Sequence, residues 1–139
     1  MERLWPVFFD DEQIGRRFAA ASQRETSRGP LRLFAGGNLE ARKGVGLALR
    51  AIAKLRELGT EVRYTFGGWG PDLANMRRLA RHLGLTDCVT FHEGFSGEEY
   101  DAVLRESDIY FLPSLRESVG ITLLEAVMAG CYPVVAGTS

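Results

Sequence analysis

The stretch PSLRESVGITLLEAVMAGCYPVV, residues 113–135, decides the fold class of this chain. It follows the apolar run IYFL at residues 109–112, which has the length and composition of a buried strand. Apolar residues then recur at helical spacing from Gly120 and stop at Gly130, a residue type favoured just beyond a helix end. Residues 132–136 are typical of the next strand. The stretch therefore predicts a strand, a helix and a second strand, which together make one βαβ unit.

The start of this predicted helix suits an anionic ligand that carries hydroxyl groups. The first backbone N–H groups of a helix lack partners within it, and with the helix dipole they attract phosphate. Glu117 precedes the helix and Glu125 follows eight residues later, so two carboxylates flank those amides. Carboxylates accept hydrogen bonds from hydroxyls. The pattern indicates a phosphorylated polyol, such as a nucleotide sugar, as the ligand.

The same alternation of strand and helix extends back along the chain. Gly, Pro and polar residues separate three further strands, at residues 31–35, 61–66 and 88–92, from three helices, at residues 44–58, 71–83 and 96–105. A capping box formed by Ser96 and Glu99 opens the last of these helices. The order predicts the α/β class: a doubly wound, mostly parallel Rossmann-like sheet with helices on both faces.

The chain divides into an irregular beginning and one domain. Residues 1–30 have little periodicity, although residues 10–20 favour a short helix with acidic residues in its first turn, and residues 22–30 are typical of a linker. Residues 31–139 form the predicted domain, which stops just after its fifth strand. We expect this domain to be incomplete at its C-terminus.

Composition excludes several classes of function. The 139 residues carry 17 basic and 18 acidic side chains, so the net charge of −1 gives no reason to expect nucleic acid as a partner. The absence of a long apolar run and of a signal-peptide pattern predicts a cytoplasmic protein. Its 2 cysteines and 2 histidines do not form a metal-ligand motif, and the cysteines are expected to be small buried hydrophobic residues. No metal or other cofactor is predicted.

In a parallel sheet of this type, ligands bind on the loops that follow the carboxyl ends of the strands. Here those loops are residues 36–44, 67–71, 93–96 and 113–120, and they hold many of the glycines and polar residues. One ligand-binding edge is therefore expected.

At this point the sequence resembles a known family. Pro113-Ser-x-x-Glu117, Gly120, Leu124-Glu-Ala126, Gly130 and Pro133-Val-Val135 are similar to the Glu-x7-Glu signature of family 4 retaining glycosyltransferases. The loop GNLEARKG at residues 37–44, the segment GWGP at residues 68–71 and the VTF run with Gly94 also match in type and order. These enzymes have the GT-B architecture, two Rossmann-like domains facing across a cleft. The resemblance covers about residues 31–136 and implies the C-terminal, donor-binding domain.

The resemblance implies roles for individual residues. Lys43 would contact the donor diphosphate and, with Glu117, would belong to the catalytic machinery, with Glu117 near the sugar hydroxyls. Glu125 would accept hydrogen bonds from the ribose. The remaining binding residues would be Gly37, Asn38, Gly68, Gly70, Gly94, Ser114, Gly120, Ile121 and Thr122.

Three departures from the family pattern stand out. Asn38 replaces the usual loop arginine, whose role Arg42 or Asn38 itself would have to fill. The sequence ESVG at residues 117–120 replaces the more usual EGFG, and FHEG at residues 91–94 is one residue longer than the common pattern.

Structural explanations compete with some of these roles. Lys43 alone would be a solvated charge, the GWGP segment a tight turn, and His92 a residue at a strand end. Glu125 lies in an apolar helix, where an unpaired buried carboxylate is costly, so it either faces a polar cleft or pairs with an arginine.

The predicted function is donor binding for transfer of a sugar, with retention, from a nucleoside-diphosphate sugar to an acceptor. The acceptor-binding N-terminal domain would be a missing partner, and membrane association would occur only through that missing part. The isolated chain is expected to be inactive. The alternative is a stand-alone, non-catalytic nucleotide-sugar-binding module. A related epimerase fits the Glu-x7-Glu spacing less well, and the missing Gly-x-Gly-x-x-Gly disfavours a dinucleotide oxidoreductase.

Overall fold

The computed structural model describes residues 12, 15, 16, 19, 29–115 and 120–136. Within them, five strands form one parallel sheet in the order β3-β2-β1-β4-β5. The elements are β1 (Leu31–Gly36), η1 (Ala41–Lys43), α2 (Val45–Glu57), β2 (Val62–Gly67), α3 (Leu73–His82), β3 (Val89–His92), α4 (Gly97–Glu106), β4 (Ile109–Leu112), α5 (Ile121–Met128) and β5 (Tyr132–Val135). The predicted α/β class is confirmed, and the elements expected within residues 31–136 lie where they were predicted, with ends shifted by a residue or two.

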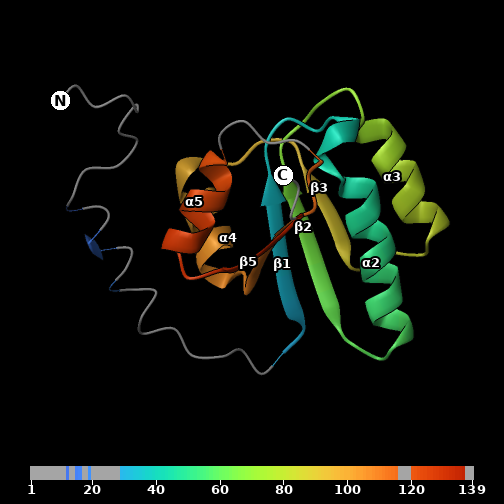
Figure 1. The fold of residues 1–139 in the computed structure, drawn as a ribbon, viewed down its shortest axis with the longest axis horizontal. Helices are drawn as coiled ribbons and strands as arrows, with labels where there is room; N and C mark the ends of the chain where they lie inside the picture. Colours follow the sequence, from blue (N-terminus) through green and yellow to red (C-terminus); the bar gives the residue numbers. More distant parts are fainter. Residues whose placement is uncertain (1–11, 13–14, 17–18, 20–28, 116–119, 137–139) are drawn as a thin grey trace.

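The helices lie in two layers on opposite faces of the sheet (Figure 1). Helices α2 and α3 cover one face, and α4 and α5 cover the other. From β1 the chain first builds outward to β2 and β3, then crosses to the other side of β1 to build β4 and β5. The point between β1 and β4, where the direction of winding reverses, is the place where doubly wound folds bind ligands.

The core is formed mainly by the central strands. In β2, Tyr64 and Phe66 are fully buried whereas Arg63 is exposed, which follows from the period of two along a strand. In β1, Phe34 is fully buried and its neighbours Leu33 and Ala35 are buried as well, because helices cover both faces of the sheet. Burying each large side chain contributes about 1.5–3 kcal/mol, so these rings hold the central strands under their helices.

Among the strands that the structure describes, β5 pairs only with β4, so one of its edges is open. The backbone N–H of Tyr132 donates to the carbonyl of Asp108 at 2.9 Å, on the β4 side. Because successive backbone groups in a strand point to opposite sides, the backbone of Pro133 faces the open edge. Proline has no N–H to donate, so this edge offers an incomplete template to another strand.

The structure also describes the two cysteines and part of the N-terminal segment. Cys88 and Cys131 are buried, form no disulfide, and each donates its S–H to a backbone carbonyl, as expected of small core residues. In the segment expected to form a short helix, Glu12 and Arg16 are helical and form an exposed ion pair at 3.7 Å. The rest of that expectation, and most of the predicted linker, falls outside the described residues.

Candidate functional site

The structure brings the loop after β1 against the loop after β4. Gly44 has φ 71°, and a Cβ atom built on it would lie 1.9 Å from the carbonyl oxygen of Pro113. The backbone N–H of Leu115 donates to the carbonyl of Arg42 at 2.8 Å, and the Ser114 hydroxyl donates to the same carbonyl at 3.3 Å. The first and fourth loops of the predicted edge therefore form one continuous surface at the switch point.

Lys43 lies at the centre of this surface. Its side chain is only 8% exposed, and its Nζ lies 4.0 Å from the position that a Cβ atom on Gly37 would occupy. The side chain thus folds back over the carboxyl end of β1 instead of extending into solvent. A solvated surface lysine would not be buried in this way, so the burial argues against the explanation that Lys43 is only a solvated charge.

Asn38 and Arg42 both bind the carboxylate of Glu40. The Asn38 amide donates to Oε1, and the Arg42 Nε donates to Oε2 at 2.7 Å. The hydrogen bond from Arg42 holds the pKa of Glu40 below its usual range, and the charge of Lys43 adds to this effect. Both residues that could replace the family's loop arginine are therefore held on the rim by a carboxylate of their own loop.

The loop after β2 supports the first loop from the side. Gly37 N–H donates to the carbonyl of Gly67 at 3.0 Å, and Leu39 N–H donates to that of Trp69 at 2.8 Å. A Cβ atom on Gly68 would lie 2.0 Å from the Gly37 oxygen, and one on Gly70 would lie 2.3 Å from the Leu39 oxygen. Close approach of two backbones thus explains both glycines without a ligand.

The first turn of α5 completes the surface from the opposite face of the sheet. Gly120 is its N-cap and supplies no side-chain cap to the first amides. The Cγ2 of Thr122 lies 3.1 Å from the position of a Cβ atom on Gly36, so Thr122 covers the end of β1. Ile121 is exposed. Lys43 and Thr122 therefore lie over neighbouring residues at the same strand end.

Glu125 pairs with a tyrosine. The hydroxyl of Tyr100, on α4, donates to Oε2 of Glu125. Of the two alternatives expected for Glu125, a polar cleft or an arginine partner, the described residues show no arginine; the packing of α4 beside α5 places a phenol there instead. Burial raises the pKa of Tyr100, and the adjacent Glu125 carboxylate raises it further, so the phenol remains a protonated donor. The nearby side chain of Thr122 acts in the opposite direction and lowers the pKa of Tyr100. Tyr100 was not among the predicted site residues, because no local sequence pattern marks a tyrosine as the partner of a distant glutamate.

The loop after β3 lies farther along the edge. The His92 ring stacks on Phe95 with centroids 4.0 Å apart and planes 5° apart, and its Nδ1 is buried without a hydrogen-bond partner in the described part of the chain. Arg77 of α3 pairs with Glu93 at 2.6 Å. Gly94 has open space around its Cα.

The predicted site residues thus fall into three groups. Lys43, Ser114 and Thr122 lie at the ends of β1 and β4 together with Gly37 and Gly120, and Ile121 and Glu125 belong to the helix α5 that begins there. Asn38 lies on the rim, while Gly68, Gly70 and Gly94 lie on the loops after β2 and β3. Glu117 lies outside the described residues. Beside the first group, a cavity of about 200 Å³ is lined by Tyr110, Leu112, Ser114, Gly120, Leu123, Val135 and Ala136.

Comparison with known proteins identifies the family. A family model described as glycosyl transferases group 1 matches residues 18–139. The chain belongs to the glycosyl transferases group 1 family. Among the residues that the structure describes, no helix is long and apolar enough to cross a membrane, and no three His, Cys, Asp or Glu side chains are grouped as metal ligands would be.

Curated relatives in this glycosyltransferase family are much longer than the chain. A 2-deoxystreptamine glucosyltransferase of Streptomyces kanamyceticus is 31% identical over 119 residues, which are 86% of this chain and 30% of that protein. A GDP-mannose-dependent alpha-(1-6)-phosphatidylinositol monomannoside mannosyltransferase of Mycolicibacterium smegmatis is 34% identical over 108 residues, 73% of this chain and 28% of that protein. The chain therefore spans about three tenths of these relatives.

Solved glycosyltransferase structures share the fold. WaaG, a glycosyltransferase involved in lipopolysaccharide biosynthesis, has a TM-score of 0.70 and 25% identity, covering 96% of this chain and 36% of that one. The catalytic domain of cholesterol-alpha-glucosyltransferase from Helicobacter pylori has a TM-score of 0.69 and 24% identity, covering 79% of this chain and 67% of that one. The Rossmann-like fold expected of a GT-B domain is confirmed.

Proposed function

We propose that this chain is the donor-binding part of a retaining glycosyltransferase that uses a nucleoside-diphosphate sugar. The observation that carries the proposal is that Lys43 and Thr122, in the first turn of α5, both lie over the end of β1, with Glu125 on the next turn of the same helix. The Lys43 ammonium and the N-terminal amides of α5 are suited to a diphosphate, and the Glu125 carboxylate is suited to the ribose hydroxyls of such a donor. The acceptor would bind to a further domain of a longer protein.

In the proposed complex, Lys43 and the first amides of α5 bind the diphosphate from two sides. A helix N-terminus binds phosphate through its unpaired N–H groups and its dipole. The Lys43 ammonium adds a full positive charge at the same strand end. Both groups favour the nucleoside diphosphate more as it departs and gains charge, so they would stabilise the transition state without moving. This account assigns no step to a metal ion, and we expect sugar transfer to persist in the presence of a chelator.

The carboxylates are assigned to the hydroxyl-bearing parts of the donor. Glu125 would accept hydrogen bonds from the ribose, and Glu117 would contact the transferred sugar. Two comparisons support this ligand class: one relative is named as GDP-mannose-dependent, and one similar structure is described as a complex with UDP and GlcNAc. The base, the sugar and the acceptor for this chain are left open by the proposal.

Calorimetry with UDP, GDP and ADP tests the donor role of Lys43. We expect Lys43→Met to weaken the best-bound diphosphate about 10- to 100-fold, since hydrogen bonds to charged groups contribute about 1.5–3 kcal/mol. Lys54→Met is the matched control, because Lys54 is exposed on α2 and pairs only with Glu57 among the described residues. A cooperative thermal melt establishes that each chain is folded. Equal affinity of the wild type and Lys43→Met would refute the assigned role.

Activity separates the proposal from the alternative of a stand-alone module. The 139-residue chain is expected to bind the donor without transferring the sugar, and a longer natural protein that contains it is expected to transfer. Turnover by the isolated chain, measured as release of nucleoside diphosphate with an acceptor present, would contradict the division of roles. A natural protein that binds the donor but carries no further domain would favour the non-catalytic module.

A further inference from the structure

Tyr100 binds one residue of the proposed donor site and lies near another. Its hydroxyl donates to Oε2 of Glu125, and the side chain of Thr122 is close enough to influence the pKa of the phenol. Thr122 and Glu125 are three residues apart on α5, so both project from one face of the helix. Tyr100 comes from a different helix, α4, and therefore fixes this face of α5 from outside.

The ring of Tyr100 is itself held firmly. It packs edge-on against Phe34, with 6.0 Å between centroids, and at a tilt of 47° against Phe95, with 6.2 Å between centroids. Phe34 is fully buried in β1. Phe95 fills the space above Gly67, where a Cβ atom would lie 2.4 Å from the Phe95 ring. The hydroxyl therefore has a defined position before any ligand binds.

The hydrogen bond leaves Glu125 able to bind a ligand. Tyr100 uses Oε2, and no other hydrogen bond to the side-chain carboxylate of Glu125 is made by the described residues. Glu125 is half-buried, so its carboxylate remains accessible. An ionised carboxylate has about four lone-pair sites, which leaves acceptor capacity for the hydroxyls of a ribose.

We propose that Tyr100 is a positioning residue of the donor site, which orients Glu125 toward the ribose. The inference rests on the function proposed above. Tyr100 does not itself touch the donor in this account. It removes rotamers of Glu125 that would otherwise be populated, and so lowers the cost of ordering that side chain when the donor binds.

Tyr100→Phe isolates the hydroxyl, because the phenylalanine ring keeps the contacts with Phe34 and Phe95. We expect the variant to bind the best-bound nucleoside diphosphate about tenfold more weakly than the wild type by calorimetry. Tyr64→Phe is the matched control. Tyr64 is fully buried, and its hydroxyl donates to the carbonyl of Phe111 at 3.3 Å. It pairs in register with Leu33, so it lies on the opposite face of the sheet from Phe34, against which Tyr100 packs. Its removal should leave diphosphate affinity unchanged.

The matching 2′,3′-dideoxynucleoside diphosphate, which lacks both ribose hydroxyls that Glu125 could bind, separates positioning from a general structural effect. If Glu125 is oriented for the ribose, the loss caused by Tyr100→Phe should shrink to about twofold or less with the dideoxy ligand, because the hydroxyl contact is already absent. Equal losses with both ligands, or no loss with either, would overturn the inference. Failure of the wild type to bind any of the three diphosphates would overturn the proposed function, and the role of Tyr100 with it.

Glu125→Gln provides a second route to the same conclusion. Glutamine keeps the shape of the side chain but replaces the carboxylate that accepts the hydrogen bond from Tyr100. If Tyr100 acts through this carboxylate, adding Tyr100→Phe to Glu125→Gln should cause little further loss of affinity. Additive losses in the double variant would mean that Tyr100 does not act through Glu125. The thermal midpoint of each variant shows whether the chain remains folded, and the double-variant comparison stays informative if Tyr100→Phe alone is partly destabilised.

Discussion

Gly44 joins the two loops of the proposed donor site through its lack of a side chain. Its φ of 71° lies in the left-handed region, and a Cβ atom would lie 1.9 Å from the carbonyl oxygen of Pro113. Any other residue at this position would therefore destabilise the chain in two ways. It would have to adopt an unfavourable backbone conformation, and its Cβ atom would collide with a backbone atom that cannot rotate away.

Gly44→Ala is expected to destabilise the chain more than a conformationally matched substitution does. Gly84→Ala serves as the match, because Gly84 has φ 68° and nothing lies within 4 Å of a Cβ atom there. The matched change should cost about 1–2 kcal/mol from backbone conformation alone. Gly44→Ala should cost at least about 2 kcal/mol more, since the loop after β4 must move. Urea unfolding measures both, and equal losses would mean that the contact with Pro113 is dispensable.

Glu125 shows where residue-level prediction from sequence reaches its limit. The cost of burying a carboxylate correctly indicated that Glu125 needs a polar environment or a partner. Its actual partner, Tyr100, lies 25 residues away along the chain. Only the packing of α4 beside α5 brings the two together, and tyrosine carries no local signal of such a role. The need for a partner was predictable, whereas its identity was not.

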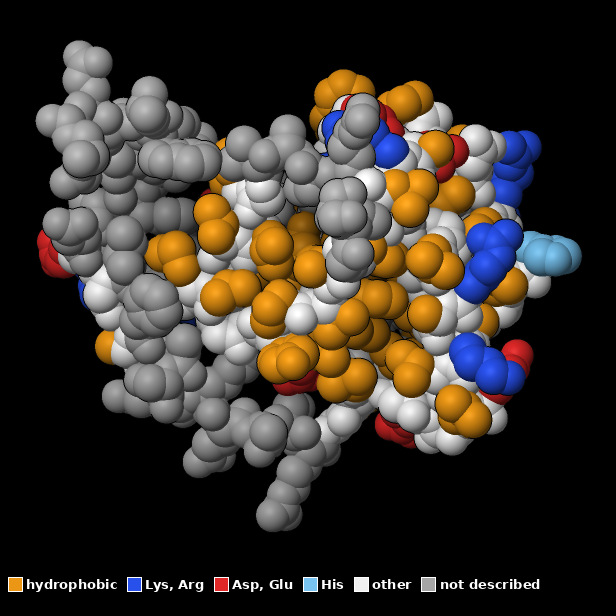
Figure 2. Space-filling model, viewed as in Figure 1, with side chains coloured by type: hydrophobic (Ala, Val, Ile, Leu, Met, Phe, Trp, Pro, Cys, Tyr) orange, Lys and Arg blue, Asp and Glu red, His pale blue; other side chains and the backbone are white. Residues whose placement is uncertain are grey.

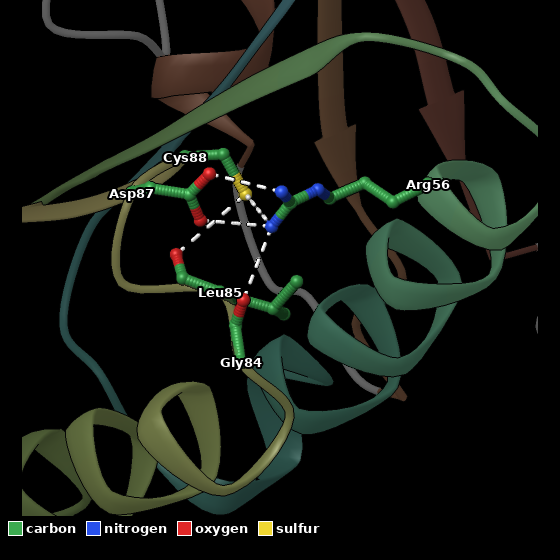
Figure 3. A network of polar contacts seen from close by, with 5 residues as sticks. All are labelled: Arg56, Gly84, Leu85, Asp87 and Cys88. Atoms are coloured by element: carbon green, nitrogen blue, oxygen red, sulfur yellow. Dashed lines mark hydrogen bonds and ion pairs between the residues drawn. The ribbon is translucent and has the colours of Figure 1, made fainter.

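At the scale of elements, Arg56 ties the end of α2 to the turn between α3 and β3 (Figure 3). Its Nη1 and Nη2 donate to the two carboxylate oxygens of Asp87 at 2.8 and 2.9 Å, and Nη1 also donates to the carbonyl of Gly84 at 3.1 Å. A paired contact of this kind fixes orientation as well as distance. The interaction anchors α2 and α3 on the same face of the sheet.

Asp87→Asn should reduce stability at neutral pH and make acid unfolding less steep. The hydrogen bond from Arg56 holds the pKa of Asp87 below its unfolded value of about 3.9. A depressed folded pKa contributes stability above the unfolded pKa and loses it as pH falls through the folded pKa. The difference in thermal midpoint between wild type and Asp87→Asn should therefore be largest near pH 7 and shrink from about pH 5 downward.

A charge change of the same sign elsewhere controls for this pH effect. Glu57→Gln removes an exposed carboxylate that pairs with Lys54 within α2, an i,i+3 contact that bridges no second element. Its thermal midpoint should differ little from that of the wild type at any pH, because exposed pairs contribute little. A difference for Asp87→Asn that does not change with pH would show that the carboxylate charge is not what matters.

Elements were more predictable than the contacts between them because their signals are local. The capping box of Ser96 and Glu99 lies within four residues, and both of its hydrogen bonds are formed. Gly130 ends α5 with φ 93°, as a glycine just beyond a helix end does. By contrast, the contact of Gly44 with Pro113 joins residues from distant parts of the chain. Sequence therefore indicated which loops share the edge, and only the fold shows how they touch.

At the scale of the whole molecule, α5 and β5 form a surface that is unusually apolar for its exposure. Side chains at three-residue intervals on α5 and three positions on β5 are exposed by 37–71%: Ile121, Leu124, Val127, Tyr132, Val134 and Val135. Figure 2 shows apolar side chains gathered over the centre of this view, where β5 crosses in Figure 1. A contiguous apolar patch favours association, because contact removes it from water.

In a pure solution of the chain, another copy is the available apolar partner, so we expect reversible self-association that strengthens with concentration. Leu124→Glu should weaken it, because a carboxylate in the patch would lose its hydration on contact. Leu124 is 59% exposed in the single chain, so the change should alter folding stability by about 0.5 kcal/mol or less. Sedimentation velocity over a concentration series, with a thermal melt of each variant, makes both measurements.

Leu58→Glu separates the effect of the patch from that of added charge. Leu58 is 71% exposed at the end of α2, on the opposite face of the sheet from α5, and the substitution introduces the same charge. If the α5–β5 surface drives association, Leu58→Glu should sediment like the wild type while Leu124→Glu remains monomeric. Equal suppression by the two variants would show that net charge, and not the apolar surface, sets the oligomeric state, since repulsion acts over the whole molecule.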